Sequence, residues 1–314
     1  METLTISYVI PAKDEEGSIK HLYKELRNAN RRHGIRKYEV IFIDDGSQDN
    51  TFGILKKIHS KDKNVKVIRF RSNLGKSLAL KAGFELAKNQ IIITMDGDLQ
   101  DNPSEIYRFL AKINEGYDLV SGWKKIRHDP WHKIIPSGIF NLTTRLLTGI
   151  EIHDINCGFK AYKRQVVENL DIYGELYRFI PVFAAKQGFA VTEIVVRHRK
   201  RKHGKSKYGV GRNLKGLIDL FTVVFLTGFI RRPAHFFGSI GLVSFFTGFV
   251  VGIFITYLRV TTGTIQDRQP LLFLGILLMI VGIQLMTTGL LAELFINTNS
   301  KRMETSFHIK ERLG

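Results

Sequence analysis

Short apolar runs alternate with amphipathic segments along the first part of the chain. The apolar runs are rich in β-branched and aromatic residues, and the segments between them carry apolar residues at helical spacing. Asn102-Pro103 is a typical helix start. Such alternation predicts βαβ units and an α/β fold with a mostly parallel, doubly wound sheet. The expected strands are 4–10, 38–43, 65–70, 90–95 and 118–122, and the expected helices are 16–32, 51–60, 75–88 and 103–115.

The pattern becomes less regular after about residue 130. Helical spacing returns near 132–148 and 175–188, and a further strand is expected near 190–196. We therefore predict one head domain that covers residues 1–210. An amphipathic segment at 211–232, which suits a membrane surface, is expected to follow it.

The last third of the chain is strongly apolar. Residues 236–258 contain no charge, and residues 271–293 contain only Glu293, at their edge. About 20 apolar residues cross a bilayer core, so both stretches predict transmembrane helices within 233–298, before a tail at 299–314. A pair of helices buried in a soluble core is the alternative, but Gly and Thr stand here in place of a polar face. The same small residues permit close packing and a homo-oligomer.

Charge predicts the orientation of these helices. The chain has a formal net charge of +18, and residues 197–215 hold nine Lys or Arg and no acid. The loop 259–269 holds two Arg and one Asp. The positive-inside rule predicts a multi-pass protein of the inner (plasma) membrane with a cytoplasmic head and termini. A membrane surface accounts for the basic surplus, so nucleic acid is not an expected partner. The single cysteine, Cys157, excludes an internal disulfide, and no signal peptide is expected.

Acidic residues gather where three of the expected strands end. The sequences are PAKDEE at 11–16, DDGSQDNT at 44–51 and DGDLQD at 96–101. The carboxyl ends of parallel strands share one edge of a sheet, so the clusters predict one crevice. Capping of the following helices is the alternative, and it accounts for about one acid per loop. Asp96 and Asp98 supply hard oxygen ligands, which predicts Mg²⁺ or Mn²⁺ shared with a substrate phosphate.

Two other phosphate or metal motifs do not fit. The sequence NLGKS at 73–77 lacks the first glycine of a P-loop, because Phe70 stands there. The stretch 96–107 is not a calcium loop, because its sixth residue is Asp101 and its twelfth is Tyr107. A divalent cation bound together with a diphosphate is therefore the better interpretation.

Six ordered segments carry a family resemblance: VIPAKDEE, DDGSQDNT, GKSLALKAGF, MDGDLQDNP, NCGFKAYKR and RHRKRKHGKSKYG. In this order the chain resembles family-2 glycosyltransferases, in particular dolichyl-phosphate mannose synthase and the bacterial enzymes that glycosylate undecaprenyl phosphate. The resemblance covers essentially the whole chain. It implies a GT-A head with two transmembrane helices, and a metal-dependent, inverting transfer of one hexose from a nucleotide sugar to a polyprenyl phosphate for cell-envelope glycosylation.

The resemblance also implies roles for individual residues. The nucleoside would be held by the ends of the first two strands, and the diphosphate and metal by the D-x-D-x-Q motif. The chain departs from the family at Lys13 and Asp14, where many members carry an aromatic residue and Asn. The implied substrate-binding residues are Pro11, Lys13, Glu15, Ile43, Asp45, Lys76, Asp96, Gly97, Lys124, Arg178 and Ser206. The implied metal ligands are Asp98 and Gln100 with Asp96, and the implied catalytic residues are Asp98, Asp154, Arg201 and Lys207.

Physical chemistry supports the basic assignments, because two anionic substrates must approach each other. A lipid-headgroup tether is the alternative for the basic run, and local hydrogen bonding is the alternative for Asp154.

The sugar is open at this stage. Glucose from UDP-glucose is the favoured donor, with mannose from GDP-mannose, GlcNAc and an aminoarabinose-type sugar as alternatives. A processive polysaccharide synthase would carry a Q-x-x-R-W motif and more spans. A non-catalytic membrane scaffold would not need the intact acidic and basic motifs.

Overall fold

The computed structural model describes residues 5–125, 131–170, 172–174, 176–199, 222–223 and 233–299, without the side chains at 131–136, 139, 266 and 296–299. The chain divides into two compact units, Met1–Val223 and Val224–Gly314, and each is described by itself. The expected surface segment 211–232 lies outside the described residues except at 222–223, and the tail lies outside them except at Asn299.

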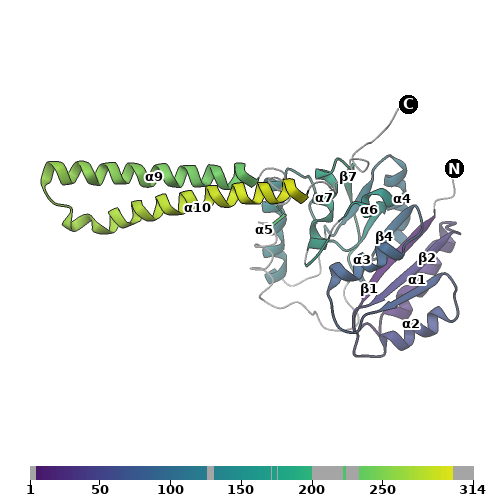
Figure 1. Cartoon of the computed structure of the whole chain (residues 1–314). Coiled ribbons are helices and arrows are strands. Elements are labelled where there is room, and N and C mark those ends of the chain that lie inside the picture. The colour runs from purple at the N-terminus through teal and green to yellow at the C-terminus, as the bar shows by residue number, and fades with distance from the viewer. Residues whose placement is uncertain are drawn as a thin grey trace. The chain divides into compact units, whose positions relative to one another are not determined.

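A single mixed sheet organises the first unit (Figure 1). Within the described residues it has seven strands in the order β3-β2-β1-β4-β6-β5-β7. Neighbouring strands are parallel except at β6, which is antiparallel to β4 and β5. The predicted α/β class with a mostly parallel sheet is confirmed. The strands are β1 Ile6–Ala12, β2 Tyr38–Asp44, β3 Val65–Arg69, β4 Ile91–Thr94, β5 Leu119–Trp123, β6 Lys160–Lys163 and β7 Val191–Val195.

Helices cover both faces of the sheet because successive strand residues point to opposite sides. Tyr8 and Ile10 lie in one core with helices α1, α2 and α4, whereas Val9 lies in the other with α3, α6 and α7. The helices of this unit are α1 Ile19–Arg32, α2 Thr51–His59, α3 Lys76–Leu86, α4 Ile106–Asn114, α5 Trp131–Thr148, α6 Arg164–Glu168 and α7 Ile180–Lys186, with short 3₁₀ turns at Pro103–Glu105 and Leu176–Phe179.

Two local predictions were wrong. Strand β6, with the sequence KAYK, was not predicted, because a lysine stands at each of its ends; in the structure Lys160 is buried and Lys163 pairs with Asp118 at 2.8 Å. Helix α1 begins at Ile19 and not at residue 16. The residues before it are used in a loop that bonds to the loop after β2.

The second unit is an antiparallel helical hairpin (Figure 1). Helices α9 Pro233–Thr262 and α10 Gln269–Asn299 are joined through a 3₁₀ turn at Gln266–Arg268. The stretches Pro233–Thr262 and Gln269–Phe295 are long and apolar enough to cross a membrane, with mean hydropathies of 2.1 and 2.3.

Glycines bring the two helices of the hairpin into backbone contact. A Cβ atom added to Gly241 would lie 2.6 Å from the Gly282 carbonyl oxygen, and one added to Gly248 would lie 2.4 Å from that of Gly275. Between these contacts the Ser244 hydroxyl donates to the Leu278 carbonyl at 2.8 Å. Small residues therefore set the distance between α9 and α10.

Candidate active site

The strand order reverses between β1 and β4, which is where open α/β sheets bind ligands. Gly97, just after β4, lies against the end of β1: a Cβ at Gly97 would be 3.3 Å from the Cβ of Ala12. The loops that follow β1 and β4 therefore meet at the expected edge of the sheet.

The first two acidic clusters bond to each other's loops. The backbone amide of Asp14 donates to the Ser47 hydroxyl at 2.9 Å, and the Asp14 carboxylate accepts from the Gln48 amide at 2.8 Å. The Glu16 amide donates to the Asp49 carboxylate at 3.1 Å. The carboxylates of Asp14 and Asp49 thus link the loop after β1 to the loop after β2.

The Asp45 carboxylate also binds backbone amides of a neighbouring loop. Its two carboxylate oxygens accept from the amides of Leu74 and Gly75, at 2.7 and 3.1 Å, and so hold the loop before α3. Ile43, in contrast, is completely buried in the core on the α3 side. The side chain of Ile43 therefore does not reach the crevice.

A cavity of about 570 Å³ opens beside these loops. Lys13 lies at its wall, as do Arg69 at the end of β3 and Arg71 just after it, so the cavity is basic. Pro11 is half-buried near the end of β1, and Glu15 is buried and accepts from the Ser18 hydroxyl at 2.6 Å. The cavity walls are formed by Lys13, Gly46, Ser47, Gln48, Arg69, Phe70, Arg71, Ser72 and Asn73.

Lysines surround the first carboxylate of the D-x-D motif. The Asp96 side chain is 33% exposed and forms an ion pair with the ammonium of Lys76. Burial alone would raise the pKa of Asp96, but Lys76, Lys124 and Lys160 lower it to about 2. Asp96 is therefore ionised at neutral pH and lies in a positive environment.

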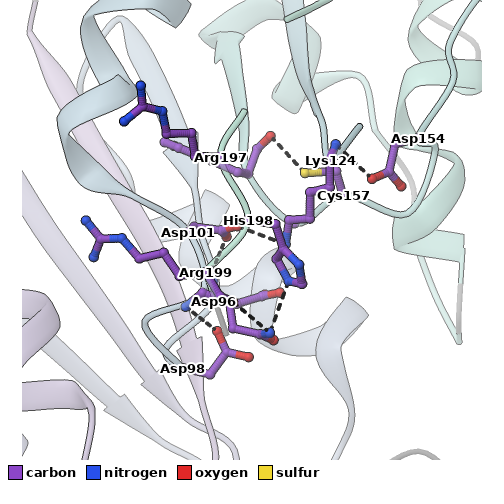
Figure 2. A network of polar contacts seen from close by, with 12 residues as sticks. Asp96, Asp98, Asp101, Lys124, Asp154, Cys157, Arg197, His198 and Arg199 are labelled. Carbon is purple, nitrogen blue, oxygen red and sulfur yellow. Dashed lines mark hydrogen bonds and ion pairs between the residues drawn. The ribbon is translucent and has the colours of Figure 1, made fainter. Parts of the chain in front are cut away.

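Lys124 links two further carboxylates (Figure 2). Its ammonium lies 2.9 Å from Asp101, and both side chains are largely buried. Its backbone amide donates to the Asp154 carboxylate at 3.3 Å. Burial lowers the pKa of Lys124, but Asp101, Cys157 and Asp96 raise it well above its ordinary value, so this lysine stays charged.

The end of the D-x-D-x-Q motif contacts the segment after β7 (Figure 2). The side-chain nitrogen of Gln100 lies 3.0 Å from Nε2 of His198, and the Arg199 amide donates to the Gln100 carbonyl at 3.0 Å. Asp98 is buried and accepts from the Gln100 amide at 3.1 Å. Between them Leu99 has a φ of 64°, a costly conformation for a residue other than glycine that is often found at functional sites.

The loop 154–158 lies directly against Asp96. A Cβ on Gly158 would come within 2.7 Å of the Asp96 carboxylate, so only glycine allows this approach. The buried ammonium of Lys160 donates to the carbonyl of Cys157, and to that of Ile155 at 3.4 Å. Burial lowers the pKa of Lys160 to about 8 and raises that of the Cys157 thiol to about 12.

Gly158, Lys160 and His198 are residues that sequence reasoning missed. The first two stand inside NCGFKAYKR, a segment that carried the resemblance, so their position was a signal that was not used. His198 stands within a basic run, and nothing in that run distinguishes it.

Tyr177 connects Arg178 to the same site. The guanidinium of the buried Arg178 lies 5.6 Å from the centre of the Tyr177 ring, and the ammonium of Lys76 lies 5.2 Å from it. The three remaining predicted residues, Arg201, Ser206 and Lys207, lie outside the described residues.

The donor set fits a hard divalent cation that is completed by a ligand. No group of three or more Asp, Glu, His or Cys within the described ranges could hold a metal ion alone. Mg²⁺, however, is usually bound through one or two carboxylates together with substrate phosphates. Asp96 already pairs with the Lys76 ammonium, so a metal ion bound by Asp96 would take the place of that ammonium.

Sequence comparisons connect this site to known enzymes. Residues 7–171 match the family model described as glycosyl transferase family 2. The chain is 32% identical over 303 residues to a dodecaprenyl-phosphate galacturonate synthase of Rhizobium johnstonii, covering 95% of this chain and 89% of that protein. It is 35% identical over 292 residues to an undecaprenyl-phosphate 4-deoxy-4-formamido-L-arabinose transferase of Pseudomonas paraeruginosa, covering 92% and 84%.

Solved structures share the fold at low identity. Glucosyl-3-phosphoglycerate synthase of Mycobacterium tuberculosis, in complex with Mn²⁺, UDP-glucose and glycerol 3-phosphate, aligns with a TM-score of 0.51 at 19% identity, over 71% of this chain and 80% of that one. Mannosyl-3-phosphoglycerate synthase of Rubrobacter xylanophilus aligns with a TM-score of 0.55 at 16% identity, over 71% and 74%. These neighbours confirm the GT-A-type fold predicted for the head. The chain belongs to glycosyltransferase family 2, and it is a glycosyltransferase.

Proposed function

We propose that this enzyme transfers one sugar from a nucleotide sugar to a polyprenyl phosphate, with inversion at the sugar carbon. The observation that carries the proposal is the pair Asp96 and Asp98 at the switch point of the sheet, next to the lysines at positions 76, 124 and 160. Such a site suits the meeting of a diphosphate leaving group and a phosphate acceptor. The galacturonate synthase and the formamidoarabinose transferase, both named for polyprenyl-phosphate acceptors, support this reading.

The donor would extend across the ends of β1, β2 and β4. The basic cavity beside Lys13 has room for the nucleoside, and the diphosphate would lie towards Asp98 and Gln100. Asp98 and Gln100, with Asp96, would hold Mg²⁺ or Mn²⁺, which when bound supplies charge neutralisation to the leaving diphosphate.

The acceptor phosphate would enter near Asp154 and Lys124. One of its oxygens forms the new bond to the sugar carbon as the bond to the nucleoside diphosphate breaks. An ionised phosphate needs no strong base, so positioning and charge neutralisation supply most of the acceleration. Lys124 and Arg178 would hold the acceptor together with Arg201 and Lys207.

We propose a UDP-linked donor and leave the sugar to experiment. UDP-glucose was the sequence-based expectation. The named relatives transfer galacturonate and formamidoarabinose, so UDP-galacturonate is an equally direct candidate. GDP-mannose is the alternative from another nucleotide class.

We also propose that α9 and α10 span the inner membrane and that the head lies on its cytoplasmic side. The basic residues before α9 support this orientation. A polyprenyl tail cannot leave the bilayer cheaply, at ~0.8 kcal/mol for each exposed CH₂ group. The crevice must therefore work at the membrane surface.

A lipid-product assay tests the proposal. The full-length protein would be incubated with undecaprenyl phosphate, Mg²⁺ or Mn²⁺, and a panel of UDP-glucose, UDP-galacturonate, UDP-GlcNAc and GDP-mannose, with products identified by mass spectrometry. We expect a glycosylated lipid with at least one UDP-sugar. Absence of any lipid-linked sugar across the panel would overturn the proposal.

Substitution of the predicted metal ligand provides the internal control. Asp98→Ala, and the isosteric Asp98→Asn, should abolish transfer and metal-dependent nucleotide binding, whereas Glu115→Gln on the exposed end of α4 should not. Circular dichroism would verify folding. Wild-type activity in the Asp98 variants, or full activity in EDTA, would contradict the metal assignment.

A further inference from the structure

We propose that Lys76 is a built-in counter-cation for Asp96, which a metal ion must displace before Asp96 can bind it. The ammonium released from Asp96 then pairs with the donor diphosphate. The second step rests on the proposed function, whereas the first concerns only the carboxylate, the lysine and a metal ion.

Long-range contacts place Lys76 over Asp96. Lys76 is the first residue of α3, and the two residues before it are held by the Asp45 carboxylate at 2.7 and 3.1 Å. Gly75 has a φ of 91°, a conformation that glycine adopts easily, and this turns the chain into the helix. Asp45 therefore acts on the site indirectly, by fixing the point from which the Lys76 side chain starts.

The other end of the Lys76 side chain is also positioned. Its ammonium pairs with Asp96 and lies 5.2 Å from the centre of the Tyr177 ring. The Tyr177 amide donates to the hydroxyl of Ser77, the residue next to Lys76, at 3.3 Å. The ion pair is thus part of a packed arrangement that joins β4, α3 and the turn at Leu176–Phe179.

Of the three lysines near Asp96, Lys76 is the most exposed to solvent. Lys124 is tied to the buried Asp101 at 2.9 Å, and the buried Lys160 donates to backbone carbonyls. The Lys76 side chain is 19% exposed and the Asp96 side chain 33%, so the pair is open to solvent at the crevice. A lysine is a flexible point charge, which can shift from one anion to another at little cost.

The Lys76 ammonium and a divalent metal ion would compete for the Asp96 carboxylate. An ammonium and a divalent ion on one carboxylate repel each other strongly at such short range. A metal ion that arrives alone must therefore displace Lys76 without compensation. A metal ion that arrives with a nucleoside diphosphate supplies a new anion for the lysine. Metal and nucleotide should consequently bind with positive cooperativity.

Metal binding without turnover tests the idea. Mn²⁺ binding to the full-length protein would be measured by electron paramagnetic resonance, alone and with UDP, for the wild type, Lys76→Met and Lys57→Met. Lys57 is exposed on α2, so its substitution is a matched change of charge. We expect Lys76→Met to bind Mn²⁺ alone about tenfold more tightly, because one nearby like charge is gone. Its enhancement by UDP should shrink, and Lys57→Met should match the wild type.

A double-substitution cycle locates the effect at Asp96. In an Asp96→Asn background, Lys76→Met should no longer change Mn²⁺ affinity. Lys76→Arg, which keeps the charge, should retain weak binding of Mn²⁺ alone, and Lys76→Gln replaces Lys76→Met if that variant does not fold. Unchanged Mn²⁺ affinity in the folded neutral variant, or an equal gain in the Asp96→Asn background, would overturn the proposal. If Lys76→Met gains Mn²⁺ affinity but the wild type transfers no sugar, the counter-cation stands and the proposed function falls.

Discussion

Lys160 is the least ordinary residue of the site. It is buried, yet its ammonium donates to the carbonyls of Cys157 and Ile155 and to no carboxylate among the described contacts. Desolvation of the charged form is the largest effect on it and lowers its pKa to about 8. Burial of the charged Lys160 ammonium therefore costs folding free energy. Its hydrogen bonds fix the loop that carries Asp154 and Gly158.

This cost should be visible in the pH dependence of stability. The pKa of Lys160 is about 8 in the folded protein and about 10.4 in an unfolded chain, so between these values the unfolded state binds more protons. The Lys160 contribution to the free energy of unfolding therefore rises with pH through this window. The Lys160→Met variant lacks this pH-dependent contribution.

Thermal unfolding at pH 7.5 to pH 10 would measure this, using the purified full-length protein. We expect the difference in melting temperature, wild type minus Lys160→Met, to increase towards pH 10. The exposed-lysine variant Lys57→Met should follow the wild type. Parallel pH profiles for wild type and Lys160→Met would show that Lys160 is not titrating in this window.

At the scale of elements, the regular spacing of glycines determines how α9 packs against α10. Gly241 and Gly248 on α9 are seven residues apart, and so are Gly275, Gly282 and Gly289 on α10. A seven-residue spacing returns to the same side of a helix, so the glycines of each helix form one line that faces the other. The apolar composition predicts that these helices cross a membrane, and the glycine spacing determines which faces meet.

Enlarging one of these glycines should separate the helices. Gly248→Leu would place a side chain against the Gly275 carbonyl, where even a Cβ would be 2.4 Å away, and overpacking of this kind costs ~1–3 kcal/mol. Gly252→Leu, one turn along the same helix, is the control, because nothing lies within 4 Å of an added Cβ. Oxidative cross-linking between cysteines at Ser244 and Leu278 reports the contact. Equal cross-linking in both variants would contradict this packing.

Glu293 has a structural explanation as well. Its carboxylate accepts from the amide of Ala234 at 3.2 Å, at the first turn of α9. Pro233 before it has no N–H, and an acid at a helix N-terminus is favourable for the helix dipole. The acid at the end of the apolar stretch thus caps the neighbouring helix.

Removal of this cap should loosen the hairpin near its open end. Glu293→Ala should destabilise it by ~1 kcal/mol, and Glu293→Gln, which keeps an acceptor, by less. Cross-linking between cysteines at Phe237 and Gly289, where an added Cβ would lie 3.0 Å from the Phe237 Cβ, compares the two backgrounds, with the Ser244–Leu278 pair as the internal reference. If Glu293→Gln is as damaging as Glu293→Ala, then charge matters and the hydrogen bond does not.

At the scale of the whole molecule, orientation decides where the chemistry takes place. The basic run before α9 and the weakly charged turn between the helices favour a cytoplasmic head. A sugar attached there would need a separate flippase to reach the far side. The native thiol does not disturb a labelling experiment, because Cys157 is buried and burial raises its pKa to about 12.

Cysteine accessibility in intact cells checks this orientation. A cysteine at Thr264, in the turn of the hairpin, should react with a membrane-impermeant maleimide from outside. Cysteines at Asn50 and His308 should react only after permeabilisation. Labelling of Asn50 or His308 from outside would reverse the orientation and remove the cytoplasmic donor from the proposal.

The sequence by itself determined the features that depend on local pattern. Apolar periodicity predicted six of the strands, six of the seven helices described in the first unit and the two long apolar helices, because side-chain spacing decides which face is buried. Helix α6 was not predicted. Acidic residues at the ends of β1, β2 and β4 predicted that the loops after these strands lie at one edge of the sheet, because parallel strands share an edge. Ordered motifs predicted the family, which the comparisons confirm.

Only the tertiary structure decided which partner each polar group found. Nothing in KAYK indicates a strand inserted antiparallel between β4 and β5, because its pairing and the burial of Lys160 come from the surrounding elements. Asp45 holds a loop and Asp96 pairs with Lys76, although both carboxylates end similar strands. Gln100, which follows β4, contacts His198, which follows β7. A carboxylate or amide takes its role from atoms brought near by the fold, and those atoms are distant in the sequence.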